Sequence, residues 1–217
     1  MKWVKPPRQE RSRDTHDRIV DAALRMLSRG LAFHEISVAE LAKEADSSIG
    51  AFYSRFRDKD ALLRVLASEL DREGVATASD TFRIAGTAPI AFESMVRAFV
   101  ALAVTYYRQQ FGLRRALLVQ MARDRDLRDR ASALAKETCM GLVTLLAPRF
   151  PSASLEQLQL AVDVVHRIVY GTLDQWLLFA DESPTGHPLD DKDMIRELTT
   201  AVHAYLRGAL GAPRDAS

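Results

Sequence analysis

The sequence predicts an all-α protein, and three observations lead to that prediction. Apolar residues recur every three or four positions along most of the chain, which is the spacing of one face of a helix. Alternating apolar and polar residues, the pattern of a half-buried strand, form no convincing run. Glycine and proline are scarce, with 10 and 8 among 217 residues, and they separate the periodic segments.

Capping signals and apolar stripes divide the chain into nine expected helices. Ser37 begins the sequence Ser-Val-Ala-Glu and Ser154 begins Ser-Leu-Glu-Gln, and both fit a capping box. Asp58 is a suitable N-cap, and Gly30 is suited to end the first helix. The expected helices span residues 14–29, 38–45, 49–55, 59–80, 88–108, 113–122, 127–147, 155–180 and 190–209.

Composition excludes several classes of protein. The formal net charge is only +1, so any nucleic-acid contact must come from local charge placement. Cys139 is the lone cysteine, which excludes a disulfide scaffold and a zinc site of several thiolates. The N-terminus lacks the apolar run of a signal peptide, and no apolar stretch is long enough to span a bilayer. We therefore expect a cytoplasmic protein with no membrane association.

Residues 1–13 differ from the rest of the chain. They carry five basic side chains against Glu10 alone, a local net charge of +4, together with two prolines and no apolar periodicity. We expect this segment to be a flexible basic arm.

Residues 36–63, ISVAELAKEADSSIGAFYSRFRDKDALL, form the most informative segment. A short helix is followed by a tight polar turn and a second short helix, the helix-turn-helix arrangement whose second helix can enter a DNA major groove. The second helix is too short to be stable alone and must lean on its neighbours. Its expected inward-facing residues are Ile49, Phe52 and Phe56, and those of the first helix are Val38, Leu41, Ala42 and Ala45.

The other face of the second short helix carries small and polar residues. On the helical wheel Ser48, Ala51 and Arg55 lie together, with Ser47 at the entry and Ser54 beside them. Serine hydroxyls and the backbone amides at a helix start suit phosphate oxygens, so this face suits a phosphodiester backbone.

Two further side chains, Tyr53 and Lys59, are placed to brace a DNA strand. The alternative is a plain helical hairpin in an α-bundle, with Tyr53 half-buried and Lys59 solvated.

The same segment resembles the DNA-binding signature of the TetR family of transcriptional regulators. Gly50, the Phe52-Tyr53 pair, Phe56, Lys59 and residues 61–63 fall in register without gaps. The resemblance extends upstream through RIVDAALRML and Gly30, so it covers about residues 14–66. It implies phosphate contacts by Ser37, Ser48, Tyr53 and Lys59, and base contacts by Ile49, Ala51 and Arg55.

Two positions depart from the family pattern. Asp46 stands where glycine is common in the turn, and aspartate is one of the non-glycine residues that best tolerate a left-handed backbone. Its charge would face the phosphates if the side chain points outward. Ile49 stands where a polar or basic residue is frequent, so we expect one contact to be missing. Because the helix has neither Asn nor Gln, we expect few directly read bases, with Arg55 suited to guanine and DNA shape supplying the rest.

Residues 88–209 contain no recognisable catalytic or metal-binding pattern. The five histidines, at positions 16, 34, 166, 187 and 203, match no metal-ligand spacing. Asp163 and His166 lie one helical turn apart, which fits a sensor or metal pair or, more simply, a surface or interface pair. We therefore expect no enzyme activity, no metal site and no cofactor.

The resemblance implies an effector pocket between the helices of this segment. Bulky, adaptable side chains suit an apolar or aromatic small molecule, although each one taken singly fits an ordinary core better. The candidates are Met95, Phe99, Tyr106, Met121, Met140, His166, Tyr170 and Trp176, with Gln109, Gln120 and Gln175 as further orienting polar groups.

The last two expected helices, 155–180 and 190–209, combine small residues with bulky apolar ones. By resemblance they form a homodimer interface, and a two-fold dimer would present two recognition helices to one palindromic site. We expect a DNA-binding domain at 14–58, a connecting helix at 59–80 whose tilt an effector would bias, and an effector-binding and dimerisation domain at 81–217.

The resulting prediction is a ligand-responsive repressor. It binds a palindromic double-stranded DNA operator as a homodimer and is released by a small apolar or aromatic effector. The alternative is an all-helical enzyme or small-molecule carrier with a vestigial DNA-binding bundle.

Overall fold

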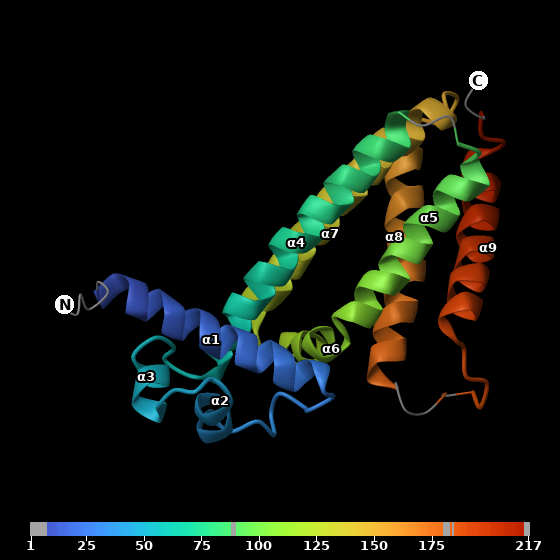
Figure 1. Ribbon diagram of the computed structural model, residues 1–217. Coiled ribbons are helices and arrows are strands. Elements are labelled where there is room, and N and C mark those ends of the chain that lie inside the picture. The colour runs from blue at the N-terminus through green and yellow to red at the C-terminus, as the bar shows by residue number, and fades with distance from the viewer. Residues whose placement is uncertain (1–7, 88–89, 180–182, 184, 215–217) are drawn as a thin grey trace. The chain divides into compact units, whose positions relative to one another are not determined.

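The computed structural model describes residues 8–87, 90–179, 183 and 185–214, and the regular structure of these residues is entirely helical (Figure 1). It confirms the all-α prediction. In chain order the elements are α1 (Arg8–Ser28), α2 (Val38–Glu44), α3 (Ile49–Tyr53), α4 (Lys59–Thr87), α5 (Phe92–Gln109), α6 (Phe111–Met121), α7 (Arg125–Leu146), the 3-10 helix η1 (Ala147–Arg149), α8 (Leu155–Leu178) and α9 (Asp191–Leu210).

Most helix ends lie within four residues of their expected positions, and two differ more. α1 begins at Arg8, so the expectation of a flexible arm is wrong for residues 8–13, while residues 1–7 lie outside the described part of the chain. Arginine, glutamine and glutamate favour helix in this segment, and the prolines that precede it are tolerated at a helix start. α4 continues to Thr87 because no proline interrupts the chain before Pro89.

The expected caps are confirmed. At Ser37 the hydroxyl accepts a hydrogen bond from the Glu40 amide at 3.1 Å, and the Ser37 amide donates to the Glu40 carboxylate at 2.8 Å. Ser154 forms the same reciprocal pair with Gln157 at the start of α8. Asp58 accepts from the Ala61 amide at 2.8 Å. These bonds satisfy amides that the first turn of a helix leaves without a partner.

The chain forms two compact units that are described separately. The first runs from α1 to Leu70 and adds Phe111–Gln120, and the second holds Asp71–Gln110 and the chain from Met121 onward. α6 therefore groups with the first unit, although the sequence placed it in the second domain. Gly112 permits this packing, because a Cβ at that position would lie 2.1 Å from the Leu27 carbonyl oxygen at the end of α1.

Each unit has an apolar core built from the predicted helical stripes. In the second unit α5, α8 and α9 pack against one another and α7 packs against α8. None of the described helices combines the length and the apolar character that a membrane span requires. Among the most buried side chains are Ile19, Leu27, Leu41, Phe52, Leu62, Leu63 and Leu66 in the first unit, and Phe92, Val100, Val169, Leu173, Leu177, Val202 and Leu206 in the second.

Candidate nucleic-acid interface

α3 has only five residues, and its neighbours hold it in place. Phe52 is fully buried and Phe56 is 2% exposed, with 5.4 Å between the two ring centroids. His16 of α1 stacks on the Phe56 ring at 5.1 Å, and α2 contributes the fully buried Leu41. α1, α2 and α3 therefore share one core, as the sequence predicted for both phenylalanines.

The turn before α3 adopts the left-handed conformation that was expected of Asp46, with φ at +46°. The Ser47 amide donates to the Ala42 carbonyl at 2.8 Å, and Arg18 of α1 donates to the Asp46 carbonyl at 2.9 Å. The Asp46 carboxylate is fully exposed and lies 3.7 Å from the Arg18 guanidinium. The charge thus points outward, but beside a cation that partly offsets it.

The outward face of α3 presents two large apolar side chains to solvent. Ile49 is 48% exposed and Tyr53 is 55% exposed, and Gly50 between them is also exposed. The prediction that Ile49 packs inward is wrong, because Phe52 fills the core position of this single helical turn. Because Ile49 is exposed, a partner can reach it, and its second predicted role of facing the bases stays a prediction.

The polar side chains of α3 are tied to the helix itself. Ser48 is the N-cap and accepts from the Ala51 amide at 3.1 Å, while Ser54 donates to the Ala51 carbonyl at 2.8 Å. Arg55 donates to the same carbonyl at 3.0 Å and to the Ser54 hydroxyl at 2.7 Å. Arg55 therefore lies along the end of the helix and must swing outward to reach a base edge.

Lys59, predicted as a phosphate contact, is used inside the protein. Its ammonium group donates to three backbone carbonyls of the α1–α2 loop, those of Phe33 at 3.0 Å, His34 at 3.2 Å and Ile36 at 2.5 Å. It also lies 5.2 Å from the centre of the Phe33 ring. Partial burial lowers the pKa of Lys59, against the opposing effect of Asp60 and Glu40. Any phosphate contact by Lys59 would compete with these bonds.

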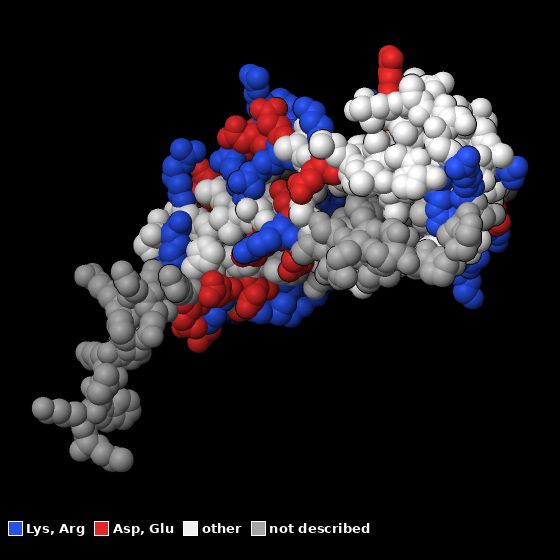
Figure 2. All heavy atoms as spheres, turned by 90° about the horizontal axis from the view of Figure 1, so that it is seen from above, with Lys and Arg blue, Asp and Glu red and all other residues white. Residues whose placement is uncertain are grey.

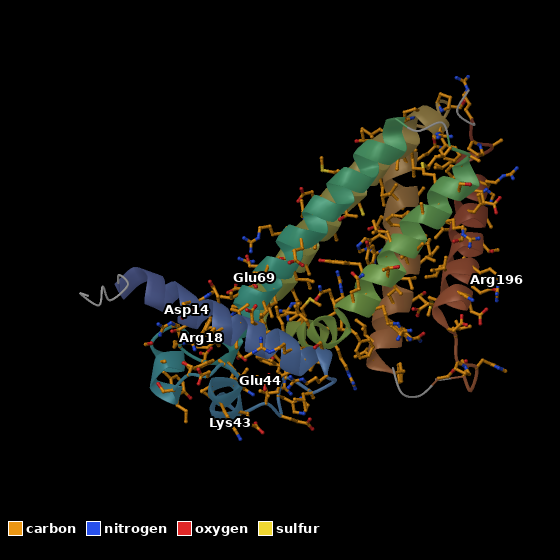
Figure 3. All side chains as sticks on the ribbon, viewed as in Figure 1. Asp14, Arg18, Lys43, Glu44, Glu69 and Arg196 are labelled. Atoms are coloured by element: carbon orange, nitrogen blue, oxygen red, sulfur yellow. The ribbon has the colours of Figure 1, made fainter. Side chains whose placement is uncertain are left out.

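An ion-pair cluster that sequence reasoning did not identify fastens α2 to α1. Glu44 accepts from Arg25 at 3.3 Å and from Arg29 at 3.4 Å, and these bonds lower the pKa of Glu44. Figure 3 labels Glu44 and Lys43 on α2 and Asp14 and Arg18 on α1. The partners are separated by 15 to 19 positions in the chain, so no local spacing could have revealed them.

Surface charge shows no single-sign field on the face drawn in Figure 2, where basic and acidic side chains are interleaved. This agrees with the formal net charge of +1. Any attraction for DNA must therefore come from local charge placement.

The predicted effector residues are distributed unevenly within the second unit. Met95 is 4% exposed, and the side chains of Phe99, Tyr106, Met121, His166, Tyr170 and Trp176 are partly buried. The structure does not place Met140 with them, because this side chain is 70% exposed on α7. Gln109 and Gln175 are exposed as well and are poorly placed to orient a buried ligand.

Aromatic and polar groups of α5 and α8 meet around His166. Its ring lies 4.5 Å from that of Tyr170, which lies 5.8 Å from Tyr107, and the Tyr107 hydroxyl donates to Asp174 at 3.0 Å. Burial lowers the pKa of His166, and Asp163 and Asp174 oppose the effect. Asp163 itself pairs with Arg167 at 2.9 Å on the surface of α8, which favours the simpler of its two interpretations.

A second connection, also missed from the sequence, joins α5, α8 and α9. The Arg108 guanidinium lies 4.4 Å from the centre of the Trp176 ring and forms an ion pair with Asp191 at the start of α9. Asp190 caps the same helix. Within the described residues, no group of three or more His, Cys, Asp or Glu side chains is arranged to hold a metal ion.

Two parts of the chain match known families. Residues 19–66 match a family described as bacterial regulatory proteins, tetR family, and residues 92–206 match the tetracyclin repressor-like C-terminal domain. No curated protein sequence matches significantly.

Solved structures share the fold. A putative TetR-family transcriptional regulator from Mesorhizobium loti has a TM-score of 0.68 at 15% identity, covering 91% of this chain and 98% of its own. The fatty acid degradation regulator FadR from Bacillus halodurans has a TM-score of 0.61 at 19% identity, covering 97% and 100%. FadR from Bacillus subtilis, solved in complex with stearoyl-CoA, has a TM-score of 0.56 at 16% identity, covering 88% and 98%. With both of its parts matched by the family, this chain belongs to the TetR family of transcriptional regulators.

Proposed function

We propose that the protein is a repressor that binds a palindromic DNA operator through α3. The observation that carries the proposal is the outward face of this helix, where Ile49 and Tyr53 are exposed although the helix beneath them is fixed by buried phenylalanines. A short rigid helix that presents side chains to solvent is suited to dock in a major groove. The proposed DNA contacts are Ser37, Ser47, Ser48, Ile49, Ala51, Tyr53, Ser54, Arg55 and Lys59.

We further propose that the operator is bound by a homodimer formed through α8 and α9. On α8 the apolar side chains of Leu155 and Leu160 are 63% and 64% exposed. Among the described residues, a Cβ at Gly171 on α8 or at Gly208 on α9 would meet no neighbouring element within 4 Å, which leaves space for another helix to approach closely. Exposed apolar side chains beside open glycine positions on the same helices are suited to contact with a second copy of the chain.

The proposed effector is a small apolar or aromatic molecule that binds in the second unit. Support comes from the partly buried side chains of Phe99, His166, Tyr170 and Trp176, which combine aromatic surface with a few polar atoms. Thermal-shift screening tests this point, because a ligand that binds only the folded state raises the melting temperature. Fatty acyl and aromatic compounds form the first panel, and a Tm that no compound raises would argue against the proposal.

DNA binding is tested by selecting duplexes from a random-sequence library with the wild-type protein. We expect palindromic duplexes whose affinity falls steeply with salt, because basic side chains displace counterions from DNA. Arg55→Ala should relax the sequence preference, whereas Arg97→Ala, at an exposed position of α5, serves as a matched control and should bind as wild type. Transcription from a promoter that overlaps the selected site should fall when the protein is added. Failure to select any duplex would instead favour a helical carrier protein.

A further inference from the structure

Gly50 occupies a position where nothing inside the described protein requires a glycine. It lies within the five-residue helix α3, and its φ is not in the left-handed region that glycine adopts at Gly30, Gly186 and Gly211. A Cβ at Gly50 would meet only the Ser48 hydroxyl, at an ordinary distance of 3.9 Å. Because alanine is favoured over glycine in a helix, the fold alone would be better served by alanine here.

The neighbouring side chains indicate that the space at Gly50 faces an external partner. Ile49 and Tyr53 on the same face are 48% and 55% exposed. By contrast, the glycine at Gly112 is explained by the fold, since a Cβ there would lie 2.1 Å from the Leu27 carbonyl oxygen. The exposed surface of α3 therefore combines two apolar side chains with a position, Gly50, that carries no side chain.

We infer that Gly50 is the point at which the DNA duplex comes closest to α3, so that the missing side chain sets how deeply the helix enters the groove. The inference rests on the proposed DNA-binding function and adds a specificity-determining position to it. Ser54 and Arg55 are folded against the end of α3. Gly50 itself is exposed, so a partner can reach the backbone of the helix at this position. A methyl group at position 50 would hold the helix away from the base edges.

The test uses the full-length chain and one duplex selected by the wild-type protein from a random-sequence library. Gly50→Ala should keep or raise the urea midpoint of unfolding and raise the Kd for this duplex at least tenfold. Gly50→Ser adds a side chain of similar size with a hydroxyl group, and it should lose affinity to a similar extent. Ser132→Thr, which adds one methyl group at an exposed position of α7, is the control and should bind within twofold of wild type.

The possible failures are distinguishable. If Gly50→Ala or Gly50→Ser binds the duplex within twofold of wild type, the close-approach inference is overturned while the proposed function stands. If the wild-type protein selects no duplex, the proposed function itself fails. Loss of affinity accompanied by a lowered urea midpoint in both variants would also overturn the inference, because it would show that the fold needs this glycine.

Discussion

At the scale of single residues, Lys59 shows how a side chain proposed to contact DNA can be bound by the protein itself. Its three donors hold the carbonyls of Phe33, His34 and Ile36, which fixes the loop that leads into α2. Hydrogen bonds to charged groups are stronger than neutral ones, and carbonyls left without donors are costly when partly buried. The residue is therefore a tether of the first unit as well as a proposed DNA contact.

Lys59→Met should accordingly destabilise the protein before any effect on DNA is considered. We expect a loss of about 2 kcal/mol in the free energy of unfolding, because three backbone carbonyls lose a charged donor. Urea denaturation followed by circular dichroism measures it. Lys43→Met, at an exposed position of α2, is the matched control and should change stability by less than about 0.5 kcal/mol. Equal midpoints for the two variants would contradict the tether.

We expect His166 to make the stability of the second unit depend on pH. Burial lowers its pKa below the ordinary value of 6.5, so the unfolded chain binds this proton more readily than the folded one. Stability from this group is thus complete above pH 6.5 and declines as the pH falls toward the lowered pKa. We expect a lower Tm at about pH 5.5 than at about pH 7.5, and a smaller difference in His166→Gln. His187→Gln, at an exposed site, should retain the wild-type difference.

At the scale of elements, the contact between α6 and α1 depends on a single missing side chain. Gly112 lies so close to the last turn of α1 that a Cβ would overlap the Leu27 carbonyl group, whose oxygen and carbon would be 2.1 Å and 2.6 Å away. Backbone atoms cannot move aside as a flexible side chain can. α6 would have to shift as a whole to accept any larger residue.

Gly112→Ala should therefore destabilise the protein by about 1–3 kcal/mol, the usual effect of overpacking. Gly50→Ala is the matched comparison in the same unit, and it should leave stability unchanged or raise it by up to about 1 kcal/mol. Both are measured by thermal and urea unfolding of the full chain. A Gly112→Ala variant as stable as wild type would mean that α6 is free to shift.

Local signals in the sequence account for most of the helices but not for their association. Ser37, Ser154 and Asp58 act through residues three positions away, so the pattern alone predicted their caps. Asp46 was likewise predictable, because the intrinsic backbone preference of aspartate is a local property. The carbonyls that bind Lys59 lie 23 to 26 positions earlier, and the grouping of α6 depends on a contact between residues 27 and 112. Such distant partners are set by tertiary packing.

At the scale of the whole molecule, the balance of charge limits how the protein can recognise DNA. With a net charge of +1 and interleaved charges on the face in Figure 2, non-specific attraction to a polyanion is weak. Two half-sites engaged at once would compensate for the modest affinity of one recognition helix. The proposed dimer and the proposed operator binding are therefore linked.

Leu160→Glu tests that link. We expect the substitution to convert the dimer to monomer at micromolar concentration, because it places two charges in an apolar contact, and to weaken operator binding at least tenfold. Sedimentation velocity and DNA-binding titrations measure the two effects. Val119→Glu, at a 56% exposed apolar position of α6, is the control and should leave the sedimentation coefficient unchanged. A wild-type chain that sediments as a monomer would exclude this mode of binding.

The two-segment make-up of the first unit also constrains protein engineering. A fragment cut after Leu70 would omit Phe111–Gln120 and uncover the surface of α1 around Leu27 that α6 packs against. Chimeras that exchange the first unit between regulators should therefore transplant α6 together with the N-terminal helices. A graft that ends at Leu70 would instead place the α6 of the recipient protein against the transplanted α1.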